Sequence, residues 1–535
     1  MTAVDLEHSR RSWWVHGVCG VIALVLALPA LFGLRSTAVA TEHVQIDGVP
    51  ITVMRPAADG DRPVVVIAHG FAGSAVIMGA LAEQIAQAGA IAVTFDFVGH
   101  GANPIAMPGG GGMSDQGRAA LQADLDTVLR WIAVQPGVDA EQLALVGHSM
   151  GAGAVVRYAI EHPTTARSVV AISLPSALEI PVGTPAVPPN LLLLVGSAEP
   201  ESFRGAALAG LHAGYPDGQL EQVYGSATSG TLRSAQVIAG SEHVGIVFAP
   251  TTATAAIQWL SDTLVIAGGA STLQLPGPAL NTLLWLTMLL VAGLFAMVPI
   301  ARLLYPRPAV RQQHRGGMLL RVVVVVAMAV VAADLVARVL QQVTEHLPLA
   351  VGGYLASWFV TAGIAIMVLT RVMPGLRPTD PDPRKRAING TDLLRAVITT
   401  TAVVLLVAIP STLTWAPFAL VGDRWWLAVV MLIAFMLFFW GEENVLHQLA
   451  GWRRWVLVVA DRVLVITALL AAIPLLGAPG FLILLLPLMV LLLFLLAGFA
   501  GIVARREGGF LATVLVQAVP LALLAATTFP LLGST

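Results

Sequence analysis

Two kinds of hydrophobic pattern divide the chain into three parts. Long, nearly continuous apolar runs occupy residues 13–34 and most of the chain from 276 to 532. Between them, apolar segments are short and alternate with polar ones, as in a water-soluble domain. Because a membrane-spanning helix needs about 20 apolar residues, we predict a tail and transmembrane signal anchor at 1–40, a folded domain at 41–265 and an eight-helix transmembrane region at 276–535.

The apolar runs predict nine membrane spans, one before the folded domain and eight after it. The predicted spans lie near 14–34, 279–302, 319–341, 349–371, 393–410, 424–441, 455–477, 481–503 and 511–532. Cytoplasmic loops of membrane proteins are enriched in Arg and Lys, and here basic residues gather in every second loop. These are Arg10 and Arg11, then Arg302, Arg307, Arg311 and Arg315, then Arg377, Arg384, Lys385 and Arg386, then Arg453 and Arg454, and finally Arg505 and Arg506. The alternation predicts a cytoplasmic N-terminus, an outside C-terminus and an extracytoplasmic domain at 41–265.

The first span has a second interpretation, as a cleaved signal peptide. Ala38-Val39-Ala40 has the small-residue pattern of a cleavage site. We favour an uncleaved anchor because the apolar run is long for a signal peptide and Trp13 and Trp14 precede it. Residues 41–265 are exported under either interpretation.

Composition supports a membrane protein and excludes several other classes. Of 535 residues, 57% are hydrophobic and only 11% are charged, and the mean hydropathy is +0.81, so neither a soluble globular protein nor a disordered one fits. The 29 basic and 31 acidic residues give no basic excess, so we expect no nucleic-acid partner. Cys19 is the single cysteine, and no motif indicates a metal or a cofactor. Lys385 is the only lysine, a bias typical of GC-rich bacterial genomes, so we expect a bacterial cytoplasmic membrane.

The folded domain alternates predicted strands and helices. A hairpin covers 43–54, and the later predicted strands lie at 63–69, 90–96, 143–149, 168–173, 191–197 and 235–240. Helices are predicted near 75–88, 117–134, from 150 onward, and near 250–264. Short continuous apolar strands between helices indicate a mostly parallel sheet with helices on both faces. The predicted fold class is therefore α/β, followed by an all-α transmembrane region.

A candidate nucleophile follows the predicted strand at 143–149. Gly147-His148-Ser149-Met150-Gly151 has the G-x-S-x-G pattern and opens a predicted helix. In this nucleophile elbow, glycines permit a tight strand-to-helix turn that presents the serine hydroxyl. Ser149 is the predicted nucleophile.

Together with two further motifs, this region resembles the α/β-hydrolase family over about 41–265. Residues 69–74, HGFAGS, look like the family's oxyanion loop, and 96–101, DFVGHG, look like the turn after its next strand. The resemblance implies a Ser–acid–His order, with His243 as the general base. It implies Glu199 as the acid, although the family's usual residue there is Asp, with Glu201 as the alternative. It also implies that the backbone N–H groups of Phe71 and Met150 form the oxyanion hole.

We therefore expect a membrane-bound serine hydrolase that cleaves an ester, thioester or amide through an acyl-enzyme. The substrate would be a small molecule or a lipid with an acyl group, close to the bilayer. Segments 174–189 and 201–233 are predicted to cover the pocket. Two alternatives stay open, namely a transporter or membrane-assembly protein with a hydrolase-like binding domain, and an acyltransferase.

The transmembrane region carries a few charged residues inside its apolar runs, where such residues are functional candidates. Asp334 and Arg338 lie one helical turn apart, so they could pair with each other, and a functional role stays equally open. Asp461 and Arg462 lie about two turns from a cytoplasmic helix end. One predicted span ends in three polar residues, which we interpret as a polar cluster at a helix end: Glu442, Glu443 and His447.

Overall fold

The structure, a computed structural model, describes twelve parts of the chain. They are residues 3–35, 39–57, 60–110, 114–264, 281–307, 318–373, 389–415, 417–447, 449, 451–483, 486–507 and 509–533. Residues 36–38 lie outside the described residues and include Ala38 of the alternative cleavage site. Much of the predicted basic loops at 308–317 and 374–388 also lies outside them.

Nine strands of the first half form one sheet in the order β1-β2-β4-β3-β5-β6-β7-β9-β8. The strands are β1 (Ala40–Ile46), β2 (Val49–Arg55), β3 (Arg62–Ala68), β4 (Ile91–Phe95), β5 (Val138–His148), β6 (Ser168–Ile172), β7 (Leu191–Gly196), β8 (Val223–Tyr224) and β9 (Arg233–Ile238). The pairs from β4 through β3, β5, β6 and β7 to β9 are parallel. The pairs β1·β2, β2·β4 and β8·β9 are antiparallel. The predicted, mostly parallel sheet is confirmed.

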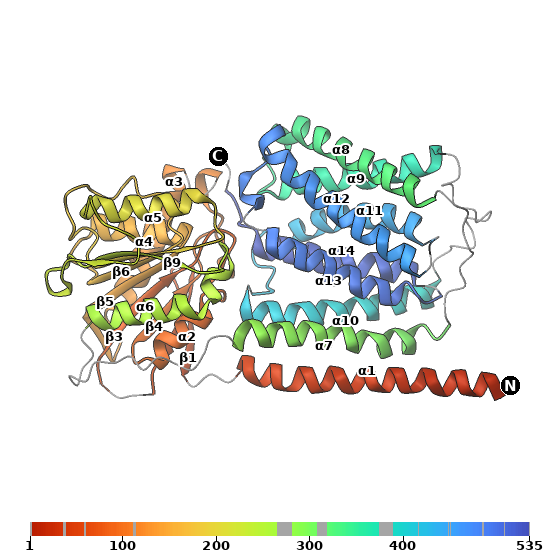
Figure 1. The fold of residues 1–535 in the computed structure, drawn as a ribbon, viewed down its shortest axis with the longest axis horizontal. Helices are drawn as coiled ribbons and strands as arrows, with labels where there is room; N and C mark the ends of the chain where they lie inside the picture. The colour runs from red at the N-terminus through yellow and green to blue at the C-terminus, as the bar shows by residue number, and fades with distance from the viewer. Residues whose placement is uncertain are drawn as a thin grey trace. The chain divides into compact units, whose positions relative to one another are not determined.

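Helices cover both faces of this sheet (Figure 1). They are α2 (Gly79–Gln87), α3 (Asp115–Ile132), α4 (Met150–Glu161), α5 (Glu201–Gly214) and α6 (Pro250–Thr263), with single 3₁₀ turns η1 (Pro108–Gly110), η2 (Ala227–Ser229) and η3 (Gly245–Phe248). One apolar core joins α3, α4 and α5 to one face, and a second joins α2 and α6 to the other. Strands buried on both faces need side chains that are apolar throughout, which explains the continuous runs Val64–Ala68 and Leu191–Val195.

The remaining helices are long and apolar. They are α1 (Ala3–Arg35), α7 (Asn281–Leu304), α8 (Met318–Thr344), α9 (Gly352–Val372), α10 (Gly390–Thr414), α11 (Arg424–Leu446), α12 (Trp452–Leu476), α13 (Leu486–Val503) and α14 (Phe510–Thr528), with a 3₁₀ turn η5 (Gly480–Ile483). Among the described residues, eight helices are long and apolar enough to cross a membrane. Leu488–Val503 in α13 is a shorter apolar helix. The predicted span at 481–503 therefore begins too early, because residues 480–483 form a 3₁₀ turn.

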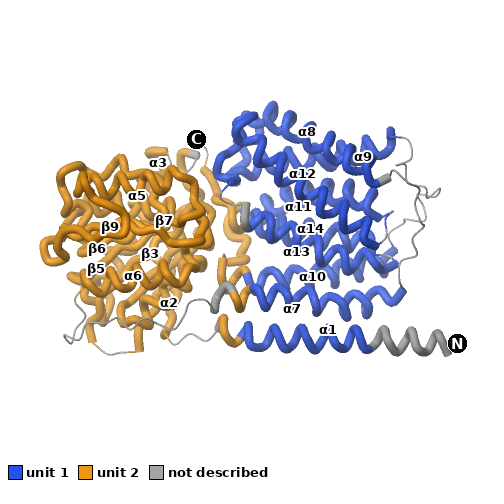
Figure 2. The backbone as a smooth tube through the Cα atoms, viewed as in Figure 1, with its two compact units in different colours: residues 1–31, 287–410, 424–526 blue, residues 32–286, 411–423, 527–535 orange. Residues whose placement is uncertain are grey.

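The chain folds as two compact units (Figure 2). One unit contains residues 1–31, 287–410 and 424–526, and the other contains 32–286, 411–423 and 527–535. The sheet therefore shares its unit with two segments from the apolar half of the chain, at 411–423 and 527–535. The hydrophobic pattern gave no sign of this sharing.

Asp334 and Arg338 do not pair with each other, although their spacing along the sequence would allow it. The Asp334 carboxylate is buried and accepts a hydrogen bond of 2.6 Å from the indole N–H of Trp358 on α9. Arg338 is exposed and donates to Gln341 on its own helix. Asp334 lies in the α8–α9 interface, where a donor from the neighbouring helix satisfies it, and Arg338 lies outside that interface.

Candidate active site

The turn between β5 and α4 holds Ser149 in an unusual backbone conformation. Its φ is +52° and its ψ is −115°, a region that non-glycine residues rarely adopt. A Cβ at Gly147 would collide with the Gly151 backbone, and a Cβ at Gly151 would collide with the carbonyls of Ala68 and His69. The two glycines thus let strand, turn and helix approach closely enough to project the hydroxyl of Ser149.

The structure brings Ser149, His243 and Glu199 into one hydrogen-bonded chain. The Nε2 atom of His243 lies 3.0 Å from the Ser149 Oγ. Its Nδ1 atom lies 2.5 Å from the Glu199 Oε1. His243 follows β9 and Glu199 follows β7, and because β7 and β9 are parallel neighbours their carboxyl ends meet at one edge.

Additional donors hold the Glu199 carboxylate. Its Oε2 accepts 2.6 Å from the backbone N–H of Gly196 and 2.9 Å from the hydroxyl of Ser173. The side chain of Glu199 is fully buried. Glu201, the sequence alternative, is the exposed first residue of α5, and the structure does not bring it to His243. The neighbouring Glu242 binds the backbone N–H groups of Val244 and Gly245 instead.

His148 is a residue of this site that the sequence analysis missed. Its Nε2 donates to the backbone carbonyl of His243 at 2.9 Å, and the two rings contact each other at a tilt of 42°, with their centroids 4.9 Å apart. Burial, and then the nearby His243, lower the pKa of His148 to about 3, so the ring is neutral at physiological pH. The ring of Phe203 on α5 contacts the His243 ring, with 4.6 Å between the two ring centroids. His148 occupies the variable position of the elbow motif, so no motif rule indicates its role.

The loop after β3, which carries Phe71, is tied to the turn after β4. The backbone N–H of Phe97 donates to His69 Nε2 at 3.1 Å, while His69 Nδ1 binds the Gly70 carbonyl at 2.7 Å. The Asp96 carboxylate accepts from the N–H groups of Ala75 at 2.6 Å and Ala102 at 2.8 Å. Burial lowers the pKa of His69 to about 4, so it acts here as a neutral ring. The residues of both recognised turn motifs therefore fix the backbone beside Phe71.

Met150, the other predicted oxyanion residue, begins α4, where helix N–H groups lack intrahelical partners.

The same two turns contact the segments from the apolar half. The Ser74 hydroxyl donates to the Trp415 carbonyl at 2.8 Å. The N–H of Leu531 donates to the Gly99 carbonyl at 2.8 Å, and Met107 N–H donates to the Leu531 carbonyl at 2.9 Å. Segments 411–423 and 527–533 thus hydrogen bond to the loops around the candidate oxyanion hole.

Comparison with known proteins identifies this domain. Residues 60–201, which include the elbow and both turn motifs, match the family described as serine aminopeptidase, S33. The parallel sheet order and the strand–turn–helix position of Ser149 agree with that match. The N-terminal part of the chain is an α/β-hydrolase domain. The predicted resemblance and fold class are confirmed.

Curated relatives match only part of the chain. An uncharacterized protein of Mycobacterium tuberculosis is 33% identical over 107 residues, which cover 20% of this chain and 35% of that protein. The sn-1-specific diacylglycerol lipase ABHD11 of Mus musculus is 28% identical over 177 residues, 32% of this chain and 52% of the lipase. The chain therefore spans well under two thirds of either relative.

Solved structures similar to the α/β-hydrolase domain include a dienelactone hydrolase from Anabaena variabilis. It is 17% identical, with 43% of this chain and all of that chain covered and a TM-score of 0.31. An esterase from Pyrobaculum calidifontis is 14% identical, with 50% of this chain and all of that chain covered and a TM-score of 0.32.

Proposed function

We propose that this protein is a membrane-bound serine hydrolase whose α/β-hydrolase domain, at 41–265, works outside the cytoplasm. The observation that carries the proposal is the continuous hydrogen-bonded chain from the Ser149 hydroxyl through His243 to Glu199. A serine hydroxyl becomes a useful nucleophile only beside a general base that a carboxylate orients. The chain of contacts supplies both partners.

In the proposed mechanism, the Ser149 oxygen attacks the acyl carbonyl while His243 Nε2 accepts the hydroxyl proton. Glu199, held by Ser173 and Gly196, fixes the ring through Nδ1 and stabilises the imidazolium. The backbone N–H groups of Phe71 and Met150 stabilise the oxyanion. His243 then gives the proton to the leaving group. In the second half of the reaction, His243 accepts a proton from the water that attacks the acyl-enzyme and gives it to the departing Ser149 oxygen.

We propose a small-molecule or lipid acyl ester as the substrate, with a thioester or amide as further members of the class. The diacylglycerol lipase among the relatives supports a lipid ester, and so does the apolar half of the chain, which keeps the enzyme at a bilayer. Transfer of the acyl group to an alcohol would use the same residues, so the products decide between the two reactions.

Covalent labelling tests the nucleophile. Purified full-length protein should react with a fluorophosphonate probe, and Ser149→Ala should abolish the labelling. Ser176→Ala, an exposed serine of the same domain, is the matched control and should label like wild type. Labelling that survives Ser149→Ala would contradict the assignment of Ser149 as the nucleophile. The alternative of a hydrolase-like binding domain would then be favoured.

We also propose nine spans in the cytoplasmic membrane, with the N-terminus inside and the C-terminus outside. His16 of α1 lies 3.0 Å from Arg302 at the end of α7 and 3.2 Å from Arg506 after α13. All three positions are predicted cytoplasmic ends of spans. Segments 411–423 and 527–533 are predicted to be outside, and they belong to the same unit as the hydrolase domain. Both findings support the predicted grouping of these ends on common sides of the membrane, and the basic loops carry the proposal of which side is cytoplasmic.

Cysteine accessibility tests the topology. Cys19 can be replaced by Ser, which leaves a cysteine-free chain. A cysteine at Leu178, which is 96% exposed in the hydrolase domain, should react with a membrane-impermeant maleimide in intact cells. A cysteine at Arg384 should react only after permeabilisation. The reverse pattern would overturn the orientation.

A further inference from the structure

A cluster of charged side chains is buried inside the unit formed by the long apolar helices. Glu442 and Glu443 near the end of α11 meet Arg454, Asp461 and Arg462 of α12. Each of the five is at most 5% exposed. Along the sequence the glutamates and the Asp461–Arg462 pair are separate features, and helix packing joins them.

Two guanidinium groups serve three carboxylates in this cluster. Arg454 binds Glu443 through both terminal nitrogens, at 3.1 and 2.7 Å. Arg462 alone serves the other two carboxylates, with Glu442 Oε2 at 3.0 Å and Asp461 Oδ2 also bonded to it. Arg462 also donates to Gln517 of α14 at 2.8 Å. With all groups ionised, the Glu442–Asp461–Arg462 set therefore carries one uncompensated negative charge.

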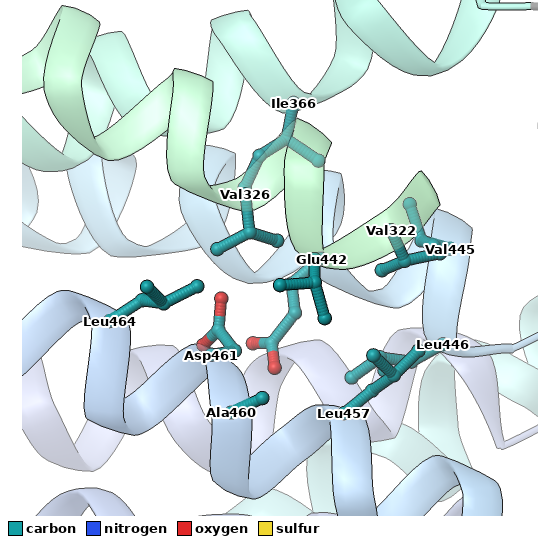
Figure 3. Close-up of a pocket in the computed structure, with 11 residues that line it drawn as sticks. Val322, Val326, Ile366, Glu442, Val445, Leu446, Leu457, Ala460, Asp461 and Leu464 are labelled. Carbon is teal, nitrogen blue, oxygen red and sulfur yellow. The ribbon is translucent and has the colours of Figure 1, made fainter. Parts of the chain in front are cut away.

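Each of these two carboxyl groups keeps one oxygen without a hydrogen-bond partner among the described residues, Glu442 Oε1 and Asp461 Oδ1. Both residues line a small cavity of about 10 Å³, and Figure 3 shows their carboxyl groups beside it. The other lining residues come from α8, α9, α11 and α12 and are apolar: Val322, Val323, Val326, Ile366, Val445, Leu446, Leu457, Ala460 and Leu464. A space of this volume holds about one water molecule.

A proton fits this site better than a metal cation does. Hard cations are held by about six oxygen ligands, whereas two free carboxylate oxygens and an apolar wall face the cavity. Within the described residues, no group of three His, Cys, Asp or Glu side chains is placed to hold a metal ion. His447, a titratable group beside the cluster, lies 3.8 Å from Glu443 Oε1, has a side chain that is 39% exposed and does not line the cavity.

We propose that Glu442 and Asp461 form a proton-binding site in the membrane region, where the two carboxyl groups share one exchangeable proton. An unpaired charge in a low-dielectric interior is costly, and one bound proton leaves Arg462 with a single carboxylate to balance. The proton also turns one free acceptor oxygen into a donor toward the other acceptor or a water in the cavity. The site is independent of the proposed hydrolase chemistry.

Infrared difference spectroscopy of the full-length protein in lipid nanodiscs tests the proposal. At neutral pH we expect the carbonyl band of a protonated carboxylic acid that shifts in D₂O. The band should disappear in both Asp461→Asn and Glu442→Gln, because each neutral amide replaces the shared proton. It should remain in His447→Gln and in Glu345→Gln, an exposed glutamate directly after the end of α8.

Three results would overturn the proposal. The first is the absence of the band from wild type, and the second is its persistence in both carboxyl variants. The third is a band that sodium ions remove at constant pH, which would make the cavity a cation site. Since each single variant leaves one carboxylate for Arg462, both should elute as monodisperse protein. If they do not, absence of the band from wild type would still overturn the proposal.

Discussion

The hydrolase domain and the membrane region both bury carboxylates beside basic side chains, but they satisfy them differently. Glu199 is surrounded by a complete set of donors from Gly196, Ser173 and His243. Glu442 and Asp461 share one guanidinium and each keep an oxygen facing a cavity. A fully satisfied carboxylate is held in one geometry, as orientation of a general base requires. An incompletely satisfied pair is suited to take up and release a proton.

Loss of the Glu199 carboxylate tests the fully hydrogen-bonded acid of the hydrolase domain and should give the largest effect. Glu199→Gln should lower kcat by about 10⁴-fold, because the amide no longer stabilises the imidazolium or its correct tautomer. Glu201→Gln, on the exposed start of α5, should stay within about twofold of wild type. Steady-state hydrolysis of a chromogenic ester would measure both. A larger loss at Glu201 would reverse the assignment of the acid.

Loss of Arg462, the cation that Glu442 and Asp461 share, tests the buried cluster of the apolar helices. Arg462→Gln leaves three buried carboxylates with Arg454 alone, and breaking a buried ion pair in this way costs about 3–5 kcal/mol. The variant should therefore unfold at a clearly lower temperature in detergent. Arg338→Gln is the control, because Arg338 is exposed and hydrogen bonds only weakly to Gln341 at 3.3 Å. Equal melting of the two variants would contradict the importance of the buried cluster.

Asp124 extends the comparison, because it is a carboxylate of the hydrolase domain that forms no ion pair among the described residues. Burial raises the pKa of Asp124 to about 6, although it accepts a hydrogen bond from the Val98 N–H. A raised pKa means that the folded state prefers the protonated form, so the stabilisation is present below about pH 4 and is lost as the pH rises through 6. Two pH units correspond to about 3 kcal/mol.

Asp124→Asn should therefore gain stability relative to wild type between pH 4 and pH 8, by up to about 3 kcal/mol. Thermal unfolding at the two pH values measures the gain. Asp115→Asn is the control on the same helix, since its side chain is 95% exposed, and it should show no such gain. A difference between wild type and Asp124→Asn that does not change with pH would contradict the assigned cause.

His148 gives the smallest expected effect. His148→Ala removes the donor to the His243 carbonyl and should lower kcat about tenfold, the equivalent of one hydrogen bond, with KM unchanged. His148→Gln keeps an N–H donor and should recover most of the activity. A loss of stability in both variants with unchanged kcat would make His148 a packing residue only.

Sequence patterns predicted much of the hydrolase domain because its chemistry is local to strand ends. The strands near β3, β5, β6 and β7 are short apolar runs, and the residues that follow each one must meet at one edge of a parallel sheet. Ser149, Glu199 and His243 could therefore be placed in order along the chain. Ser173 and His148 could not, because their roles depend on which carboxylate or carbonyl lies across the turn.

The apolar half of the chain was predictable only as a set of candidate spans. Apolar length and the alternation of basic loops follow from the thickness and electrostatics of a bilayer, so the pattern of residues along the chain was enough to predict candidate membrane spans beside an α/β-hydrolase domain. Helix packing decided the partners. It placed Trp358 rather than Arg338 beside Asp334, joined Glu442 to Asp461 through Arg462, and put Trp415 and Leu531 on the hydrolase turns. These contacts join residues far apart along the chain, and one-dimensional periodicity carries no information about which helix faces which.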